Sequence, residues 1–350
     1  MSRESSARWP GTEPPRSGAS SPSDADVIPL LTKEQTVSAS AMRETSAVDP
    51  AGGGAVVRFI RRRPLVSFFL WAYTVGQVLP WSVTAAGLAD RAWLMSGSVV
   101  VSTFVGLLLP ALVITRIADG PEALRGLWRR AVKMRVGVAW YAAAFLLVPA
   151  VTLAVGVLVG GGPPDRSVRF LLSTLGPHFL LPLLVTFVLI NWWEEVTWMG
   201  FVQARLQDWR GPLLAAVLVA PLFALQHSSL AAGQGLVPGA VLLLLLAVLA
   251  VPFRIALGWA YNRTGSLFLV GLIHAAGNAT TGGDGVNAGY LRHLYPGNSN
   301  VTMAHLLAMV LLGLLVLIVT RGRLLGADTP KPPERSRRAA ATAHATKDES

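Results

Sequence analysis

Long apolar segments dominate the sequence between residues 64 and 320. About 20 consecutive apolar residues cross a bilayer as a helix, so each segment of that length predicts a transmembrane helix. We place about eight of them, at 64–86, 92–115, 136–159, 172–204, 211–231, 236–257, 265–281 and 301–320. The predicted fold class is therefore all-α, a polytopic membrane helix bundle.

Composition supports a membrane protein and excludes several functions. The 350 residues are 52% hydrophobic and only 14% charged, which is too apolar for an ordinary soluble protein. The formal net charge of +11 comes from basic residues beside apolar segments, so we expect a lipid bilayer as partner and no nucleic acid. The absence of cysteine excludes disulfides, thiol catalysis and cysteine-based metal sites.

The two ends of the chain differ in composition from its middle. Residues 1–55 are rich in Ser, Pro, Gly and charge, and residues 324–350 have the same character. Such segments cannot bury enough apolar surface to fold, so we predict two disordered cytoplasmic tails around a transmembrane bundle at 56–323.

Basic residues indicate the orientation of the bundle. They precede the first span at 61–63 and cluster in the loop 116–135, whereas the opposite loops hold only Arg91, Arg166, Arg169 and Arg292. The positive-inside rule then places both termini in the cytoplasm of a multi-pass protein, which we expect in a bacterial plasma membrane.

Two adjacent carboxylates, Glu194 and Glu195, lie near the end of the fourth apolar segment. An ionised glutamate costs several kcal/mol in hydrocarbon, and neither has a basic residue within one helical turn along the chain. Side chains at adjacent positions point about 100° apart on a helix, so the two cannot face the same way. The pair is a candidate functional site.

Two further predicted helices carry polar groups one turn apart. "FALQH" places Phe223 and His227 on a common face of the fifth segment, and "HAAGN" does the same for His274 and Asn278 on the seventh. Each of these polar residues alone could instead be an interhelical hydrogen-bond partner. The remaining histidines, by their positions near span ends, in a loop or in a tail, look ordinary: His178, His293, His305 and His344.

The ordered set "EEVTWMGF", "FALQH" and "HAAGN" resembles the three motifs of the CPBP intramembrane proteases, the group of the CAAX prenyl endopeptidases and the Abi bacteriocin-immunity proteins. The likeness covers about residues 170–280, which we take as a CPBP-like protease core. "GFVQARLQ" and "NRTGSLFLVGLIH" extend it beyond the polar residues. Each motif alone is weak, but the order and spacing together are specific.

One position departs from the family pattern. The family usually has an arginine four residues after the second glutamate, where this chain has Met199. An arginine there would lie one turn from Glu195 and could pair with it. Without it, Glu195 has to be protonated or matched from another helix, and Arg254 or Arg263 could reach it.

The resemblance implies peptide hydrolysis with Glu194, Glu195, His227, His274 and Asn278 as catalytic residues. Glu194 is the expected base for a nucleophilic water that His227 helps to hold, and His274 with Asn278 would stabilise the oxyanion. Family members are described both as metalloproteases and as metal-independent enzymes. Zn²⁺ or another divalent metal on Glu194, His227 and His274 is therefore an open alternative, although the chain has no HExxH sequence.

The sequence thus favours an intramembrane endopeptidase that acts on a membrane-associated protein or peptide, in a cavity reached from the cytoplasm or the bilayer. Met199 motivates the alternative of a catalytically silent relative that binds and protects or regulates a partner. A transporter using the glutamates for proton coupling is a third possibility. Separation of Glu194 from both histidines by more than about 8 Å, too far for one shared water, would contradict catalysis.

Overall fold

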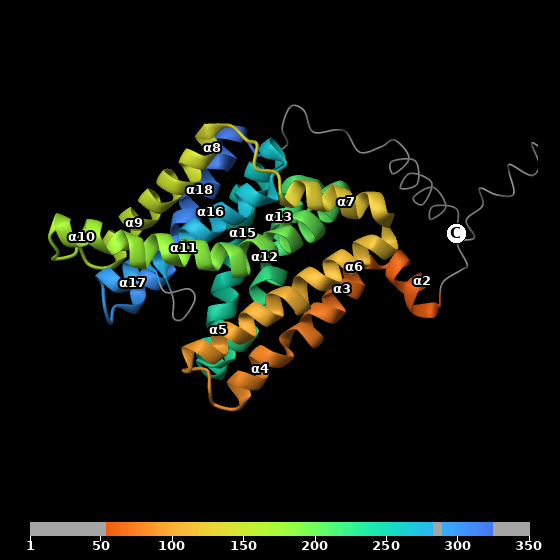
Figure 1. Ribbon diagram of the computed structural model, residues 1–350, viewed down its shortest axis with the longest axis horizontal. Coiled ribbons are helices and arrows are strands. Elements are labelled where there is room, and N and C mark those ends of the chain that lie inside the picture. The colour runs from red at the N-terminus through yellow and green to blue at the C-terminus, as the bar shows by residue number, and fades with distance from the viewer. Residues whose placement is uncertain (1–53, 283–288, 325–350) are drawn as a thin grey trace, which may run out of the picture. The chain divides into compact units, whose positions relative to one another are not determined.

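The computed structural model describes residues 54–282 and 289–324, and this part of the chain is helical without any strand (Figure 1). Five of its helices are long and apolar enough to cross a membrane: Ala92–Ala118, Val138–Val159, Val168–Leu225, Leu236–Thr264 and Ser299–Thr320. The all-α membrane class is therefore confirmed. The count of eight spans is not.

The difference in number has local causes. Val168–Leu225 is 58 residues long and contains the fourth predicted span and most of the fifth. Its backbone leaves the helical conformation at Gly211, where φ is 74°, so one continuous assignment hides a bend. The first predicted span is divided at Thr74, and the seventh is a helix of only 15 residues.

The described chain begins with two antiparallel arms. The first comprises α2 (Ala55–Arg62), α3 (Pro64–Tyr73), η1 (Val75–Gln77) and α4 (Val78–Ala85). The second returns along it through α5 (Ala92–Val101), η2 (Ser102–Leu108), α6 (Leu109–Ala118) and α7 (Gly120–Ala131). Gly76 and Gly106 let the arms touch, because a Cβ on Gly76 would lie 2.8 Å from the Gly106 Cα.

The middle of the chain is a series of helices joined by π-helical turns. One apolar rod comprises α8 (Val138–Ala142), η3 (Ala143–Leu147) and α9 (Val148–Val159). The next comprises α10 (Val168–Leu175), η4 (Gly176–Leu180), α11 (Leu181–Thr186), η5 (Phe187–Asn191), α12 (Trp192–Thr197), η6 (Trp198–Gln203) and α13 (Ala204–Leu225). π-helical turns are rare and recur at functional sites, and two of them flank α12.

The last part of the chain supplies the central helix of the bundle, α16, together with several outer helices. It comprises α14 (Ser228–Ala232), α15 (Leu236–Thr264), α16 (Leu267–Thr281), α17 (Tyr290–Leu294), η8 (Ser299–Met303) and α18 (Ala304–Thr320). Almost every side chain of α16 is buried, and this helix packs against α9, α11, α12 and α18. Outer helices such as α15 and α18 expose leucines and valines, as contact with lipid requires.

The basic helix ends gather on one side of the bundle, which we call the basic end. Arg61 Nε donates to the Ile117 carbonyl (3.3 Å), Arg205 pairs with Asp119, and Lys133 Nζ donates to the Thr264 carbonyl (2.7 Å). These contacts bring the end of α2, the α6–α7 corner, the start of α13 and the end of α15 together.

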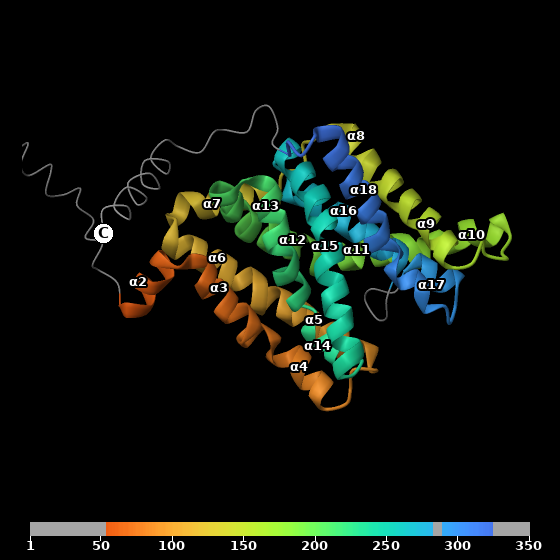
Figure 2. The same ribbon diagram turned by 180° about the vertical axis from the view of Figure 1, so that it is seen from behind.

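The other ends of these helices form the opposite end of the bundle. Thr84 Oγ1 donates to the Ser229 carbonyl (3.0 Å), which joins α4 to α14. Figure 2 shows these two helices close together at this end. Asn298 Nδ2 donates to the Gly160 carbonyl (3.2 Å), which joins the end of α9 to the segment before α18.

The predicted disordered tails lie outside the described residues except at their inner edges. Helix α2 already begins at Ala55, and Leu324 is buried against Ala216 and Ile255. The folded part therefore extends slightly beyond the predicted limits of 56–323.

Candidate active site

Helix α12 carries the two glutamates into the interior of the bundle. Glu194 is 4% exposed and Glu195 is fully buried. Glu194 lines a cavity, whereas Glu195 turns toward α15, in agreement with the angle between adjacent helical positions. The two carboxylates therefore have different surroundings and different chemical uses.

Glu195 is paired with Arg254 of α15. Arg254 Nη1 donates to both carboxylate oxygens at 2.9 Å, and the arginine is fully buried. Its Nε donates to Gln203 Oε1 at 3.0 Å, and Gln203 Nε2 donates back to the Arg254 carbonyl at 3.3 Å. A buried ion pair needs such additional hydrogen bonds to offset desolvation.

This pair resolves the question that Met199 raised. Met199 is buried one turn after Glu195. Of the two arginines that could reach Glu195 from elsewhere, Arg254 does so. Gly258 gives Gln203 the room to support it, because a Cβ at Gly258 would lie 2.6 Å from Gln203 Nε2. The chain thus makes between helices the charge pair that an arginine in place of Met199 would make within one helix.

His274 joins the same network from α16. Its Nδ1 lies 3.0 Å from Glu195 Oε1 and 4.0 Å from Glu194 Oε2. An ionised carboxylate only accepts hydrogen bonds, so Nδ1 carries the proton and donates to Glu195. Nε2 is then the nitrogen available to a substrate, a water or a metal.

His227 lies just beyond the end of α13, as the first residue before α14. Its Nδ1 donates to the Phe223 carbonyl at 3.1 Å, because a carbonyl can only accept. The Phe223 ring contacts both histidines, with centroids 5.2 Å from His227 and 6.1 Å from His274. Nε2 of His227, like that of His274, is left for chemistry in the cavity.

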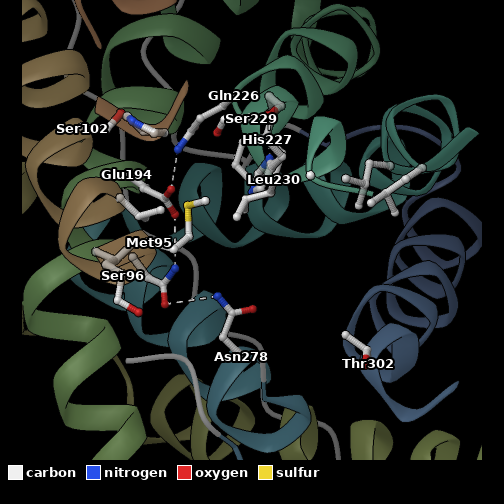
Figure 3. Close-up of a pocket in the computed structure, with 18 of the residues that line it drawn as sticks. Met95, Ser96, Ser102, Glu194, Gln226, His227, Ser229, Leu230, Asn278 and Thr302 are labelled. Atoms are coloured by element: carbon white, nitrogen blue, oxygen red, sulfur yellow. Dashed lines mark hydrogen bonds between the residues drawn. The ribbon is translucent and has the colours of Figure 1, made fainter. Parts of the chain in front are cut away.

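Amide side chains hold Glu194 in place (Figure 3). Gln226 Nε2 donates to Glu194 Oε1 at 2.6 Å, and Asn191 Nδ2 donates to Oε2 at 3.2 Å. Asn278 Nδ2 donates to Asn191 Oδ1 at 3.3 Å, which places it on the same side of the cavity. Trp198 in turn donates its indole N–H to Gln226.

The cavity between these helices has a volume of about 1000 Å³. Glu194, His227, His274 and Asn278 all line it, and Glu195 stands directly behind His274. All five residues singled out in the sequence are therefore brought together, and Glu194 lies well within the 8 Å limit from His274. A space of this size accommodates a short peptide segment.

Sequence reasoning missed some parts of the site. Gln226 lies inside the quoted "FALQH" stretch, and Asn191 precedes the first glutamate by three residues. An amide residue within or beside a motif was therefore the sequence signal that could have identified both. His305 was taken as ordinary because it lies near a span end. It is 4% exposed and lines the cavity, with its ring 6.3 Å from that of His274.

Two other histidines lie away from the site, at the opposite end of the bundle. The rings of His178 and His293 stack with centroids 3.6 Å apart. Burial first, and then the nearby positive groups His178 and Arg166, lower the pKa of His293. Neither residue lines the cavity of Glu194.

The three residues expected as metal ligands line one cavity without converging on a single point. Within the described part of the chain, no three His, Asp or Glu side chains stand close enough together to hold a metal ion. Glu194, His227 and His274 line one cavity, where both histidines keep Nε2 available while the Glu194 oxygens accept from amides.

Comparison with protein families agrees with the motifs. Residues 176–280 match the family model described as type II CAAX prenyl endopeptidase Rce1-like. The segment contains α12, α13 and all but the last residue of α16, and with them all five predicted site residues. No match was found among curated proteins or among solved structures. The predicted resemblance to this protease family is confirmed over that segment.

Proposed function

We propose that the protein is an intramembrane endopeptidase that hydrolyses a peptide bond of a membrane-associated protein or peptide. One observation carries the proposal: Glu194 and His274 face one cavity within 4.0 Å of each other, while Arg254 neutralises the second carboxylate. The match to a protease family over residues 176–280 supports it.

Glu194 is the general base in this proposal. A water held between Glu194 and the free Nε2 of His227 would lose a proton to the carboxylate as its oxygen attacks the substrate carbonyl. The same proton then passes from Glu194 to the leaving amine as the C–N bond breaks. Gln226 and Asn191 fix the carboxylate so that little reorganisation is needed at each transfer.

Asn278 and His274 stabilise the oxyanion. Asn278 has a second amide N–H besides the one bound to Asn191, and it can donate that hydrogen to the developing negative charge. Glu195 stabilises a positive charge on His274, whose Nε2–H then becomes a second donor. Arg254 keeps Glu195 in the ionised form that this role requires.

Terminus profiling in host membranes tests the proposal. New protein termini are quantified with the wild type and with Glu194→Gln at matched expression. Glu122→Gln is the control, because this substitution makes the same chemical change at an exposed residue of helix α7. We expect termini that occur with the wild type and the control and disappear with Glu194→Gln. Identical profiles for all three would refute proteolysis by Glu194.

One observation favours a second candidate, a catalytically silent binding protein. Both oxygens of Glu194 already accept a hydrogen bond from an amide, which is the arrangement of a structurally held carboxylate. Such a protein would capture a membrane partner in the cavity without cleaving it. Identical terminus profiles together with recovery of one intact protein by wild-type membranes, lost in Glu194→Gln, would favour this candidate.

A further inference from the structure

We infer that the cavity opens on the side of the membrane opposite the cytoplasm, and that its substrate is an apolar peptide segment presented on that side. The position of the opening is independent of catalysis, whereas the substrate class rests on the proposed function. Access from the cytoplasm was the expectation from the sequence, together with access from the bilayer.

The exposed residues of the cavity wall locate its opening. Most of the lining is buried or partly buried, and the exposed members stand at helix ends: Asp90, Leu230, Gly233, Gln234 and Thr302. Asp90 precedes α5, Gly233 and Gln234 lie between α14 and α15, and Thr302 lies just before α18. All of these positions belong to the end of the bundle opposite the basic end.

The basic end is defined by charge and faces away from this opening. Among the described residues it carries Arg58, Arg61, Arg62, Arg63, Arg116, Arg125, Arg129, Arg130, Lys133, Arg135, Arg205, Arg210, Arg263, Arg321 and Arg323. The described opposite loops carry only the four arginines at 91, 166, 169 and 292. Because cytoplasmic loops hold the excess of Lys and Arg, the basic end faces the cytoplasm and the opening faces outward.

The wall between the opening and the catalytic groups indicates the class of substrate. Apolar side chains line it from three helices: Met95 and Val99 of α5, Leu242 and Leu246 of α15, and Leu306 of α18. Glu194 and His274 line the same cavity and are almost fully buried. The apolar wall and the catalytic groups together fit an apolar stretch of an exported or membrane-anchored protein that enters from the outer leaflet.

Single cysteines test the direction of the opening, because the chain has none of its own. Asp90→Cys marks the opening, Ser102→Cys is a near-isosteric change inside the cavity, and Glu122→Cys marks the basic end. Each variant is treated with a charged, membrane-impermeant thiol reagent in intact cells and, separately, in inside-out vesicles. Labelling is read by mass spectrometry.

We expect Asp90→Cys and Ser102→Cys to react in intact cells, and Glu122→Cys to react only in inside-out vesicles. Reaction of Glu122→Cys in intact cells would reverse the orientation and overturn the inference. So would reaction of Ser102→Cys only in inside-out vesicles, or in neither preparation. Labelling does not depend on proteolysis. The orientation of the cavity can therefore be refuted while the Glu194 test confirms cleavage, and cleavage can be refuted while labelling confirms the orientation.

A separate observation concerns His305 on α18. This histidine is 4% exposed and lines the cavity, yet neither of its ring nitrogens has a hydrogen-bond partner within the described part of the chain. Its ring packs over Gly277, where a Cβ would lie 1.8 Å from His305 Cε1, and edge-on to Phe253 with centroids 5.7 Å apart. Buried polar groups are nearly always hydrogen-bonded, so two unpaired and buried nitrogens on a side chain that lines a cavity point to a partner that enters the cavity.

We propose that His305 binds the peptide backbone of the substrate. A neutral imidazole offers one N–H donor and one lone-pair acceptor, which match the carbonyl and the N–H of a peptide. This role rests on the proposed function, and it makes His305 a substrate-binding residue outside the matched segment 176–280.

Two replacements separate binding from packing. His305→Phe keeps an aromatic ring against Phe253 but removes both hydrogen bonds, whereas His305→Gln keeps one donor and one acceptor. With the cleaved protein found by terminus profiling as substrate, we expect KM to rise about tenfold or more for His305→Phe and less than threefold for His305→Gln.

The proposal is overturned if His305→Phe leaves KM unchanged, or if a folded His305→Gln variant loses cleavage despite its donor and acceptor. Thermal unfolding of both variants shows which of them are folded. Should His305→Phe fail to accumulate, the Gln variant decides alone, and retained cleavage supports the proposal. Absence of cleavage by the wild type would instead reject the proposed function.

Discussion

At the scale of single residues, Arg254 determines the surroundings of Glu195. A fully buried carboxylate such as Glu195 is stable only when it is protonated or paired, and sequence reasoning left both possibilities open. Arg254 provides the pair from another helix, with two contacts of 2.9 Å. His274 is thereby given an ionised acceptor for its Nδ1–H.

Replacement of Arg254 by methionine tests this pairing. The change leaves Glu195 buried without its cation, so we expect a loss of about 3–5 kcal/mol in the free energy of unfolding. Arg263→Met on the same helix is the control, because Arg263 is exposed and its loss should cost about 0.5 kcal/mol or less. Denaturation in detergent micelles measures both.

The double variant Met199→Arg, Arg254→Met checks the physical reason. It moves the cation to the position one turn after Glu195 and should recover at least half of the stability lost in Arg254→Met. If the double variant is no more stable than Arg254→Met, the role of Arg254 is not the neutralisation of Glu195.

Asn278 allows a second test at the same scale. Asn278→Asp keeps the size of the side chain but replaces the N–H donors with an acceptor. Removal of one oxyanion donor typically lowers kcat by about 10²–10³-fold, and we expect that loss here with KM little changed. An equal kcat in the variant would show that Asn278 has only a structural role through Asn191.

At the scale of helices, the site depends on the close approach of α16 to α12. Gly271 makes this approach possible, because a Cβ there would lie 2.7 Å from the Trp192 Cα and 3.2 Å from its backbone nitrogen. The backbone of α12 cannot move away without carrying Glu194 and Glu195 with it. The short distance between His274 and the carboxylates therefore requires a glycine at position 271.

Gly271→Ala should therefore separate the two helices. We expect a destabilisation of about 1–3 kcal/mol from overpacking and a loss of cleavage from the displaced His274. Gly126→Ala on the exposed helix α7 is the matched control, since its Cβ would meet only the end of the Arg130 side chain at 3.5 Å. Unfolding and terminus yield are measured on both. Full activity of Gly271→Ala would contradict the dependence on this spacing.

The helical class was predictable because apolar length alone predicts membrane helices, but the number of spans was not. Gly211 and Thr74 interrupt helices by local backbone conformation, which average hydropathy does not report. The π-helical turns η5 and η6 around α12 leave no mark in the apolar pattern either. These two turns lie directly before and after the segment that carries both glutamates.

At the scale of the whole molecule, the site is assembled from helices far apart in the sequence. The motif positions Glu194, His227 and His274 were identified by spacing, and the fold brings them to one cavity. From the sequence, the candidates for the partner of Glu195 could be narrowed only to Arg254 and Arg263. The choice between them depends on how α12 and α15 pack in the tertiary structure. His305 was missed for the same reason, since it is buried by α16 and not by its own helix.

Metal removal is a prediction for the protein as a whole. Because no three ligands converge in the described part of the chain, we expect the yield of cleavage products to be unchanged after treatment with EDTA or phenanthroline. A zinc-dependent protease assayed in parallel controls for chelation. Loss of cleavage that added Zn²⁺ restores would show that the side chains rearrange around a metal.

Oxygen-isotope incorporation by purified enzyme tests the central claim, the activation of water by Glu194, most directly. Wild type and Glu194→Gln are reconstituted in vesicles with the cleaved protein in water enriched in ¹⁸O. We predict that the wild type releases a fragment whose new carboxyl group carries one ¹⁸O atom, and that Glu194→Gln releases none. A Glu194→Gln variant that forms the same labelled fragment at the wild-type rate would contradict the mechanism.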